Sequence, residues 1–174
     1  MLTTLSEEVV EVAQDCTDAI GFLVVGSCLD SANERLQKAR IELEEALAVA
    51  EMLSDKEPTV FNRIIIKGGI DSATGNPKIV SNLLTIVKLC GMISQSCSKA
   101  LRFGVTDGYP NRNTTNAEDI IGLLNELSAI AMTTLPKTDS DEWKGPINSK
   151  AREAKKVRVV EWMEYAAKQG TLNS

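Results

Sequence analysis

The sequence has no histidine among its 174 residues, and this absence removes several kinds of active site at once. Serine and cysteine nucleophiles that depend on an imidazole base are excluded. Four cysteines are present but lack the C-x-x-C spacing of zinc sites, so we expect small apolar fillers at Cys16, Cys28, Cys90 and Cys97. Any catalysis must therefore rest on carboxylates, lysines, tyrosines or a metal.

Aromatic residues and long apolar runs are also scarce. Aromatics make up 4% of the chain, and no apolar stretch reaches the roughly 20 residues that a membrane-spanning helix needs. The N-terminal residues lack the basic region of a signal peptide. Apolar residues make up 43% of the chain and charged residues 25%, with alanine, leucine, glutamate and lysine frequent. We therefore expect a soluble, cytoplasmic, all-α protein of one domain, with no membrane partner.

Charge is distributed unevenly along the chain. Residues 1–57 hold 13 acidic and 4 basic side chains, whereas residues 58–174 hold 11 and 15. The densest basic run consists of Lys150, Arg152, Lys155, Lys156 and Arg158. It is weaker than the basic stripe of a typical DNA-binding surface, so we expect no nucleic-acid partner and interpret the run as the solvated face of a helix.

Helix start signals and apolar periodicity divide the chain into five helices. Three capping boxes pair Thr4 with Glu7, Ser31 with Glu34, and Thr115 with Glu118. The predicted helices cover residues 5–22, 32–53, 78–103, 116–135 and 149–168. Between them, residues 54–77 are rich in glycine and proline, and we interpret them as a connector that holds a short helix or an extended piece.

The chain also matches itself at a constant offset of 81 residues. Gln14 aligns with Gln95 and Cys16 with Cys97, and the second helices continue in the same register. This pattern favours an internal duplication, with repeat one at 2–54, a connector at 55–77, repeat two at 83–135 and a C-terminal helix at about 149–168. We expect two helical hairpins in a four-helix bundle with a pseudo-twofold axis. One chain could then imitate a homodimer, or two chains could pair further.

Two pairs of glutamates are candidates for chemistry. Glu8 and Glu11 share one face of the first helix, and Glu42 and Glu45 share one face of the second. In an antiparallel hairpin the two pairs can converge, and four like charges repel unless a cation neutralises them. Carboxylate oxygens are the ligands that Mg²⁺ and Mn²⁺ prefer. The alternative is a solvated helix face without a metal.

These residues resemble a known family. The segments 5–13 and 42–49 are similar to the E-x-x-E … E-x-x-D signature of the MazG-like all-α nucleoside triphosphate pyrophosphohydrolases. The resemblance implies a helical bundle in which Glu8, Glu11, Glu42 and Glu45 bind Mg²⁺, or Mn²⁺, and carry catalysis. The family usually has aspartate at the last position, whereas this chain has Glu45, which is one methylene longer.

Repeat two resembles a phage and bacterial subgroup of the same family through other segments. They are residues 98–104, 107–110, 115–119, 124–127 and the C-terminal 165–172. Its acidic positions are largely lost, because the offset of 81 places Leu89, Met92 and Leu123 where repeat one has glutamates. Of the four positions, only the counterpart of Glu45 is still acidic, and it is Glu126. Conversely, repeat two has Lys99 and Arg102 where repeat one has Asp18 and Gly21.

In the family that the chain resembles, the site is assembled near a dimer interface, so the resemblance and this reciprocal loss together imply one composite site. Carboxylates would come from repeat one, and repeat two would bind substrate through Lys99, Arg102, Asp107 and Tyr109. The two cations would meet phosphate charge, and Tyr109 would offer a stacking surface for a base. The alternatives are a plain turn at Asp107 and Gly108, and an exposed basic pair favoured by the helix dipole.

The resemblance therefore implies a magnesium-dependent enzyme that converts a nucleoside triphosphate, with ribose or deoxyribose, into a monophosphate and pyrophosphate. One alternative is an inactive relative that binds or sequesters a nucleotide. Another is a helical module that binds a different protein, with the glutamates as plain surface. The expected partner in the first two cases is a small nucleotide.

Overall fold

The computed structural model describes residues 1–26, 28–56, 78–108, 113–136 and 150–169. Within these ranges the chain forms five α-helices: α1 (Leu2–Val25), α2 (Leu29–Lys56), α3 (Ile79–Phe103), α4 (Asn116–Thr134) and α5 (Lys150–Lys168). The predicted all-α fold is confirmed. Most of the connector lies outside the described residues, so its predicted conformation stays a prediction.

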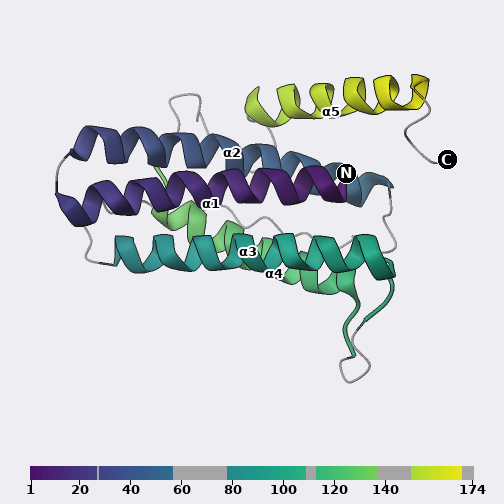
Figure 1. Cartoon of the computed structure of the whole chain (residues 1–174), viewed down its shortest axis with the longest axis horizontal. Coiled ribbons are helices and arrows are strands. Elements are labelled where there is room, and N and C mark those ends of the chain that lie inside the picture. The colour runs from purple at the N-terminus through teal and green to yellow at the C-terminus, as the bar shows by residue number, and fades with distance from the viewer. Residues whose placement is uncertain (27, 57–77, 109–112, 137–149, 170–174) are drawn as a thin grey trace.

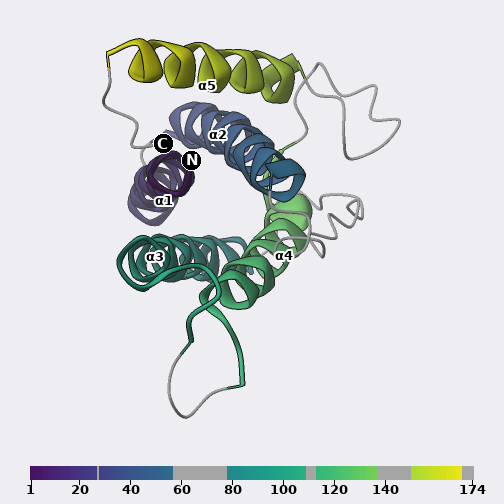
Figure 2. The ribbon, with the colours of Figure 1, turned by 90° about the vertical axis from the view of Figure 1, so that its right-hand side faces the viewer.

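The helices form three layers (Figures 1 and 2). The α1–α2 hairpin lies over the α3–α4 hairpin, and together they make the four-helix core. Direct packing joins α1 to α2, α1 to α3, and α3 to α4. The hydroxyls of Ser6 and Ser94 hydrogen-bond between α1 and α3 at 2.7 Å. Helix α5 lies on α2, on the side away from the second hairpin.

The burial pattern of the two hairpins repeats at the offset of 81 residues. All seven buried residues of α1 have a buried counterpart in α3, beginning with Leu5 and Ile86 and ending with Ala19 and Ala100. The same holds for Leu36 with Ala117 and for Leu43 with Leu124 in the second helices. Both hairpins thus present the same helix faces to the core, as the self-alignment predicts.

Two of the three predicted capping boxes are wrong, because their helices begin earlier. Thr115 and Glu118 form the full reciprocal box at the start of α4. Helix α1 begins at Leu2 without a side-chain cap, so Thr4 is already inside the first turn. Ser31 is likewise inside α2, and its hydroxyl donates to the Cys28 sulfur at 3.1 Å. Apolar periodicity continues past both serine and threonine, and the helices extend with it.

Three of the four cysteines are buried in the core, as predicted. Cys16, Cys90 and Cys97 are buried, and burial raises the pKa of each thiol to about 12, so they are unreactive fillers. Cys28 is exposed, unlike the prediction.

Among the described helices, α3 alone has the length and hydropathy of a membrane span. It packs between α1 and α4, which is compatible with a soluble protein.

Candidate functional site

Three of the four predicted glutamates converge on one point of the α1–α2 hairpin. Glu8, Glu42 and Glu45 each place one carboxylate oxygen within 4.8 Å of the others. Glu8 comes from α1, whereas Glu42 and Glu45 lie three residues apart on α2, so the antiparallel hairpin brings the two helix faces together as expected. We call these three residues the carboxylate cluster.

Glu11 borders the cluster. It is exposed on α1, and its side chain hydrogen-bonds that of Glu42. Partial burial, together with the charge and hydrogen bond of Glu11, raises the pKa of Glu42 to about 7 from the ordinary value of 4.5. Two carboxyl groups form such a hydrogen bond only when one carries a proton. Burial and the neighbouring carboxylates therefore favour the protonated form of Glu42 up to about pH 7.

Glu8 is the most buried member of the cluster, with 5% of its surface exposed. Burial raises the pKa of its carboxyl, although a hydrogen bond from Lys155 opposes that effect. Its Oε2 atom has no hydrogen-bond partner among the described residues. A buried carboxylate oxygen without a donor is costly, and a divalent cation held by oxygen ligands would satisfy it. The residues present thus fit Mg²⁺ or Mn²⁺.

The cations that contact the cluster come from α5. Lys155 Nζ binds Glu8, and it lies 3.1 Å from Glu45 Oε2. Arg158 Nη2 is 2.5 Å from Glu45 Oε1. Burial alone would lower the pKa of Lys155, but its hydrogen bonds to Glu8 and Glu45 outweigh burial and raise that pKa. Lys155 is thus held charged against the cluster.

A second group of ion pairs lies beside the cluster and anchors α5. Arg152 is completely buried, and its guanidinium binds Glu44 and, at 2.6 Å, Glu51 Oε1. Lys156 Nζ is 2.8 Å from Glu51 Oε2. Arg40 Nη2 is 2.9 Å from Glu44 Oε1, so a buried network links α2 to α5. The interpretation of the basic run as a solvated face is therefore wrong for Arg152 and Lys155, whereas Arg158 is exposed.

No known protein family, curated protein or solved structure matches this chain. The resemblance drawn from the glutamate spacing therefore rests on the residues themselves.

The predicted substrate-binding residues of repeat two lie on α3 and in the loop that follows it. Lys99 is half-buried on α3, and the Arg102 guanidinium lies 5.8 Å from the centroid of the exposed Phe103 ring. Tyr109 lies outside the described residues. The cations in contact with the cluster are Lys155 and Arg158, and the expected contact of Lys99 and Arg102 with phosphate stays a prediction.

Hydrogen bonds join the described ends of the loop after α3. Gly108 N–H donates to the Asp107 side chain at 2.9 Å, and the Asp107 carbonyl accepts from Asn116 N–H at 2.7 Å. A Cβ on Gly108 would lie 2.3 Å from the Thr114 carbonyl oxygen, so only glycine fits there. These contacts assign Asp107 a structural role, whether or not it also binds a ligand.

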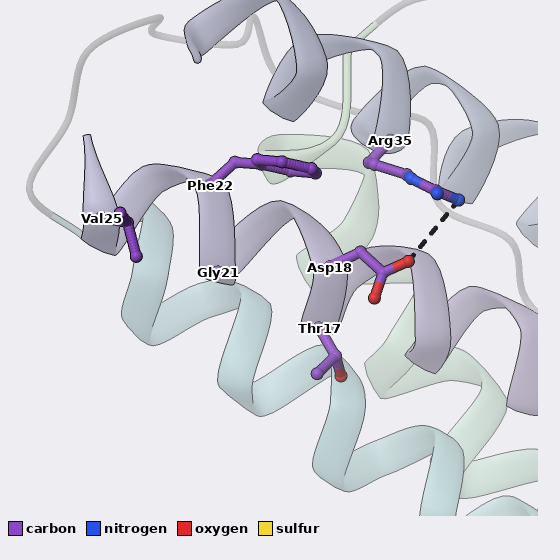
Figure 3. Close-up of a pocket in the computed structure, with 6 residues that line it drawn as sticks. All are labelled: Thr17, Asp18, Gly21, Phe22, Val25 and Arg35. Atoms are coloured by element: carbon purple, nitrogen blue, oxygen red, sulfur yellow. Dashed lines mark ion pairs between the residues drawn. The ribbon is translucent and has the colours of Figure 1, made fainter. Parts of the chain in front are cut away.

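An open cleft of about 520 Å³ lies farther along the α1–α2 hairpin (Figure 3). It is lined by Thr17, Asp18, Gly21, Phe22, Val25 and Arg35. Asp18 and Arg35 form an ion pair across it at 3.5 Å. Gly21 is the counterpart of Arg102, so this cleft exists where repeat two has a long side chain. None of the clustered glutamates lines it.

Proposed function

We propose that the protein is a divalent-cation-dependent nucleoside triphosphate pyrophosphohydrolase, with its site at the carboxylate cluster. The observation that carries the proposal is the convergence of Glu8, Glu42 and Glu45, with the unsatisfied Glu8 Oε2 among their oxygens. These glutamates stand at the spacing that resembles the family signature. Mg²⁺ or Mn²⁺ is the cofactor, and a nucleotide is the partner.

The residues at the cluster would have two roles, cation binding and proton transfer. Glu8, Glu42 and Glu45 would hold the cation, with Glu11 at the edge of the site. When bound, the ion supplies positive charge to the polyphosphate and lowers the pKa of a bound water. Without the cation, the pKa of Glu42 is raised to about 7. A bound cation would favour the ionised carboxylates, and one of the four would then accept the proton of the attacking water.

The proposed reaction breaks one phosphoanhydride bond. The water oxygen bonds to the α-phosphorus, the bond from that phosphorus to the bridging oxygen breaks, and pyrophosphate leaves. Cationic side chains would offset the charge of the leaving group. The resemblance assigns this role to Lys99 and Arg102 of α3, and a nucleotide pool would supply the substrate.

The test is product analysis with a panel of nucleoside triphosphates and deoxynucleoside triphosphates in Mg²⁺. We expect a monophosphate and pyrophosphate from the wild type, and a loss of at least about 100-fold in rate for Glu42→Gln, which keeps the size but cannot accept the proton. Glu126→Gln is the matched control, because Glu126 is exposed and is the sole acid in repeat two at a counterpart of the four glutamates. Equal rates for wild type and Glu42→Gln would reject this site.

A second candidate function is nucleotide binding without hydrolysis. The observation that favours it is that Lys155 and Arg158 already neutralise Glu8 and Glu45. A lysine that permanently replaced the cation would leave a folded protein without its metal chemistry. Intact nucleotides after incubation, together with measurable nucleotide binding by calorimetry, would support this function over hydrolysis.

A further inference from the structure

Helix α5 is attached to the hairpin mainly by charge. Four basic side chains on one face of α5 pair with glutamates of α1 and α2; they are Arg152, Lys155, Lys156 and Arg158. Apolar contact is small by comparison: within the described side chains of α5, Val159 is buried in the core and Met163 packs partly against it. The outer face of the helix is exposed. A contact of this kind can be displaced by a competing cation.

Two of these basic residues bind the carboxylates that would hold a metal. Lys155 contacts both Glu8 and Glu45, and Arg158 contacts Glu45. An ammonium group and a divalent cation repel each other at this separation, and they require the same oxygen lone pairs. Glu8 Oε2 is buried beside the ammonium and lacks a donor among the described residues, so lysine satisfies the cluster incompletely.

We propose that α5 is an internal cap that competes with a divalent cation for the carboxylate cluster. When the cation binds, it takes the oxygens of Glu8 and Glu45 and releases Lys155 and Arg158. The proposal rests on the cation site of the proposed function, and it adds that the site is closed by the protein's own cationic helix.

Competition has two measurable consequences, because coupling between two binding events is reciprocal. The cap lowers the apparent affinity for the cation, since only the fraction of molecules with an uncapped cluster can bind it. The cation in turn loosens α5. Removing a basic residue that touches the cluster must therefore strengthen cation binding, whereas removing one that touches only the neighbouring glutamates must leave it unchanged.

The experiment measures Mn²⁺ binding to the full chain by the electron paramagnetic resonance signal of free Mn²⁺. We expect Lys155→Met to bind Mn²⁺ about tenfold more tightly than the wild type, because one full charge next to two ligands is removed. Arg158→Gln should bind a few-fold more tightly. Lys156→Met is the matched control, because Lys156 is adjacent on the same helix and pairs with Glu51 and Glu153.

Arg158→Gln also guards against a folding defect in Lys155→Met. The Arg158 side chain is 52% exposed, so its loss should leave the fold intact. Unchanged or weaker Mn²⁺ binding in Arg158→Gln and in folded Lys155→Met would overturn the cap. Failure of every variant to bind Mn²⁺ would overturn it as well.

Hydrogen exchange supplies the reciprocal readout. Saturating Mn²⁺ should speed amide exchange in residues 152–168 by about tenfold or more, while amides of α3 stay protected. Exchange in α5 that is unchanged or slowed by Mn²⁺ would overturn the proposal.

Nucleotide turnover, measured on the same preparations, separates the cap from the proposed function. Hydrolysis by the wild type with unchanged Mn²⁺ affinity in Lys155→Met would reject the cap and leave the function standing. Tighter Mn²⁺ binding in Lys155→Met without turnover in any protein would support the cap and reject the enzyme.

Discussion

The two hairpins bury the same helix positions but fill them with different chemistry. Glu8 of the first hairpin corresponds to Leu89 of the second, and Arg40 corresponds to Ile121, with all four side chains buried. Each pair is separated by 81 residues. The helix packing therefore sets which positions are buried, and it accepts a charge or an aliphatic group at the same place.

What differs between the hairpins is the need for a fifth helix. A buried charge is costly unless it is paired, so the first hairpin requires cations for its glutamates. Arg152 and Lys155 of α5 supply them, and α5 packs on α2. The second hairpin has Leu89 where the first has Glu8, and Met132 where the first has Glu51, so these positions require no such partner. Helix α5 is therefore a partner of the acidic hairpin.

The largest effect on stability is expected from Arg152→Met. This change removes the buried guanidinium that joins Glu44 and Glu51 to α5, although Arg40 and Lys156 still contact them, so the free energy of unfolding should fall by about 3 kcal/mol. Urea denaturation followed by circular dichroism measures the change. Arg102→Met, on an exposed position of the second hairpin, should shift stability by less than about 0.5 kcal/mol. Equal stability of the Arg152→Met variant and wild type would show that the ion pairs of α5 do not stabilise the acidic hairpin.

The sequence predicts the helices well because apolar periodicity is strong along all of them. Predicted and observed helix ends differ by at most three residues, and the offset of 81 predicts the shared burial register. Capping signals are weaker because they are local. At Thr4 and Ser31 the helix simply continues toward the N-terminus, where further residues can add backbone hydrogen bonds.

The glutamates of the site were also predictable, but the basic helix that covers them was not. Spacing of three residues on each helix of a hairpin is enough to bring Glu8, Glu42 and Glu45 together. Docking of α5 depends on contacts between residues more than 100 positions apart, and a basic helix face has the same pattern in solvent or on an acidic surface. The available signal was the opposite charge of the two parts of the chain, with Val159 and Met163 following Arg152 and Lys155 on one helix face.

A smaller effect should follow from pH. Burial raises the pKa of Glu42 to about 7, so between pH 4.5 and 7 the folded protein binds more protons than the unfolded chain. Stability should therefore rise as pH falls from 7.5 to 5.5, by about 1 kcal/mol after allowance for solvent screening. Urea denaturation in a chelating buffer at the two pH values measures this gain.

Glu42→Gln is the control for the pH effect. Glutamine cannot ionise, so the variant should be more stable than wild type at pH 7.5 in the absence of metal, and its own gain at pH 5.5 should be smaller. The second hairpin has Leu123 at this position and contributes no such titration. A wild type whose stability falls between pH 7.5 and 5.5 would contradict the raised pKa of Glu42.

The smallest net effect is expected from a change that makes the first hairpin resemble the second. The double variant Glu8→Leu with Lys155→Met gives position 8 the leucine of its counterpart Leu89 and removes the cation that Glu8 required. Glu45 keeps Arg158. Replacing both members of a buried pair by apolar groups is often neutral, so its stability should stay within about 1 kcal/mol of wild type. Lys155→Met alone should lose more stability in chelating buffer, because it leaves the buried Glu8 charge without a cation. A double-mutant cycle from urea denaturation measures the coupling, and purely additive losses would mean that Glu8 and Lys155 do not stabilise each other.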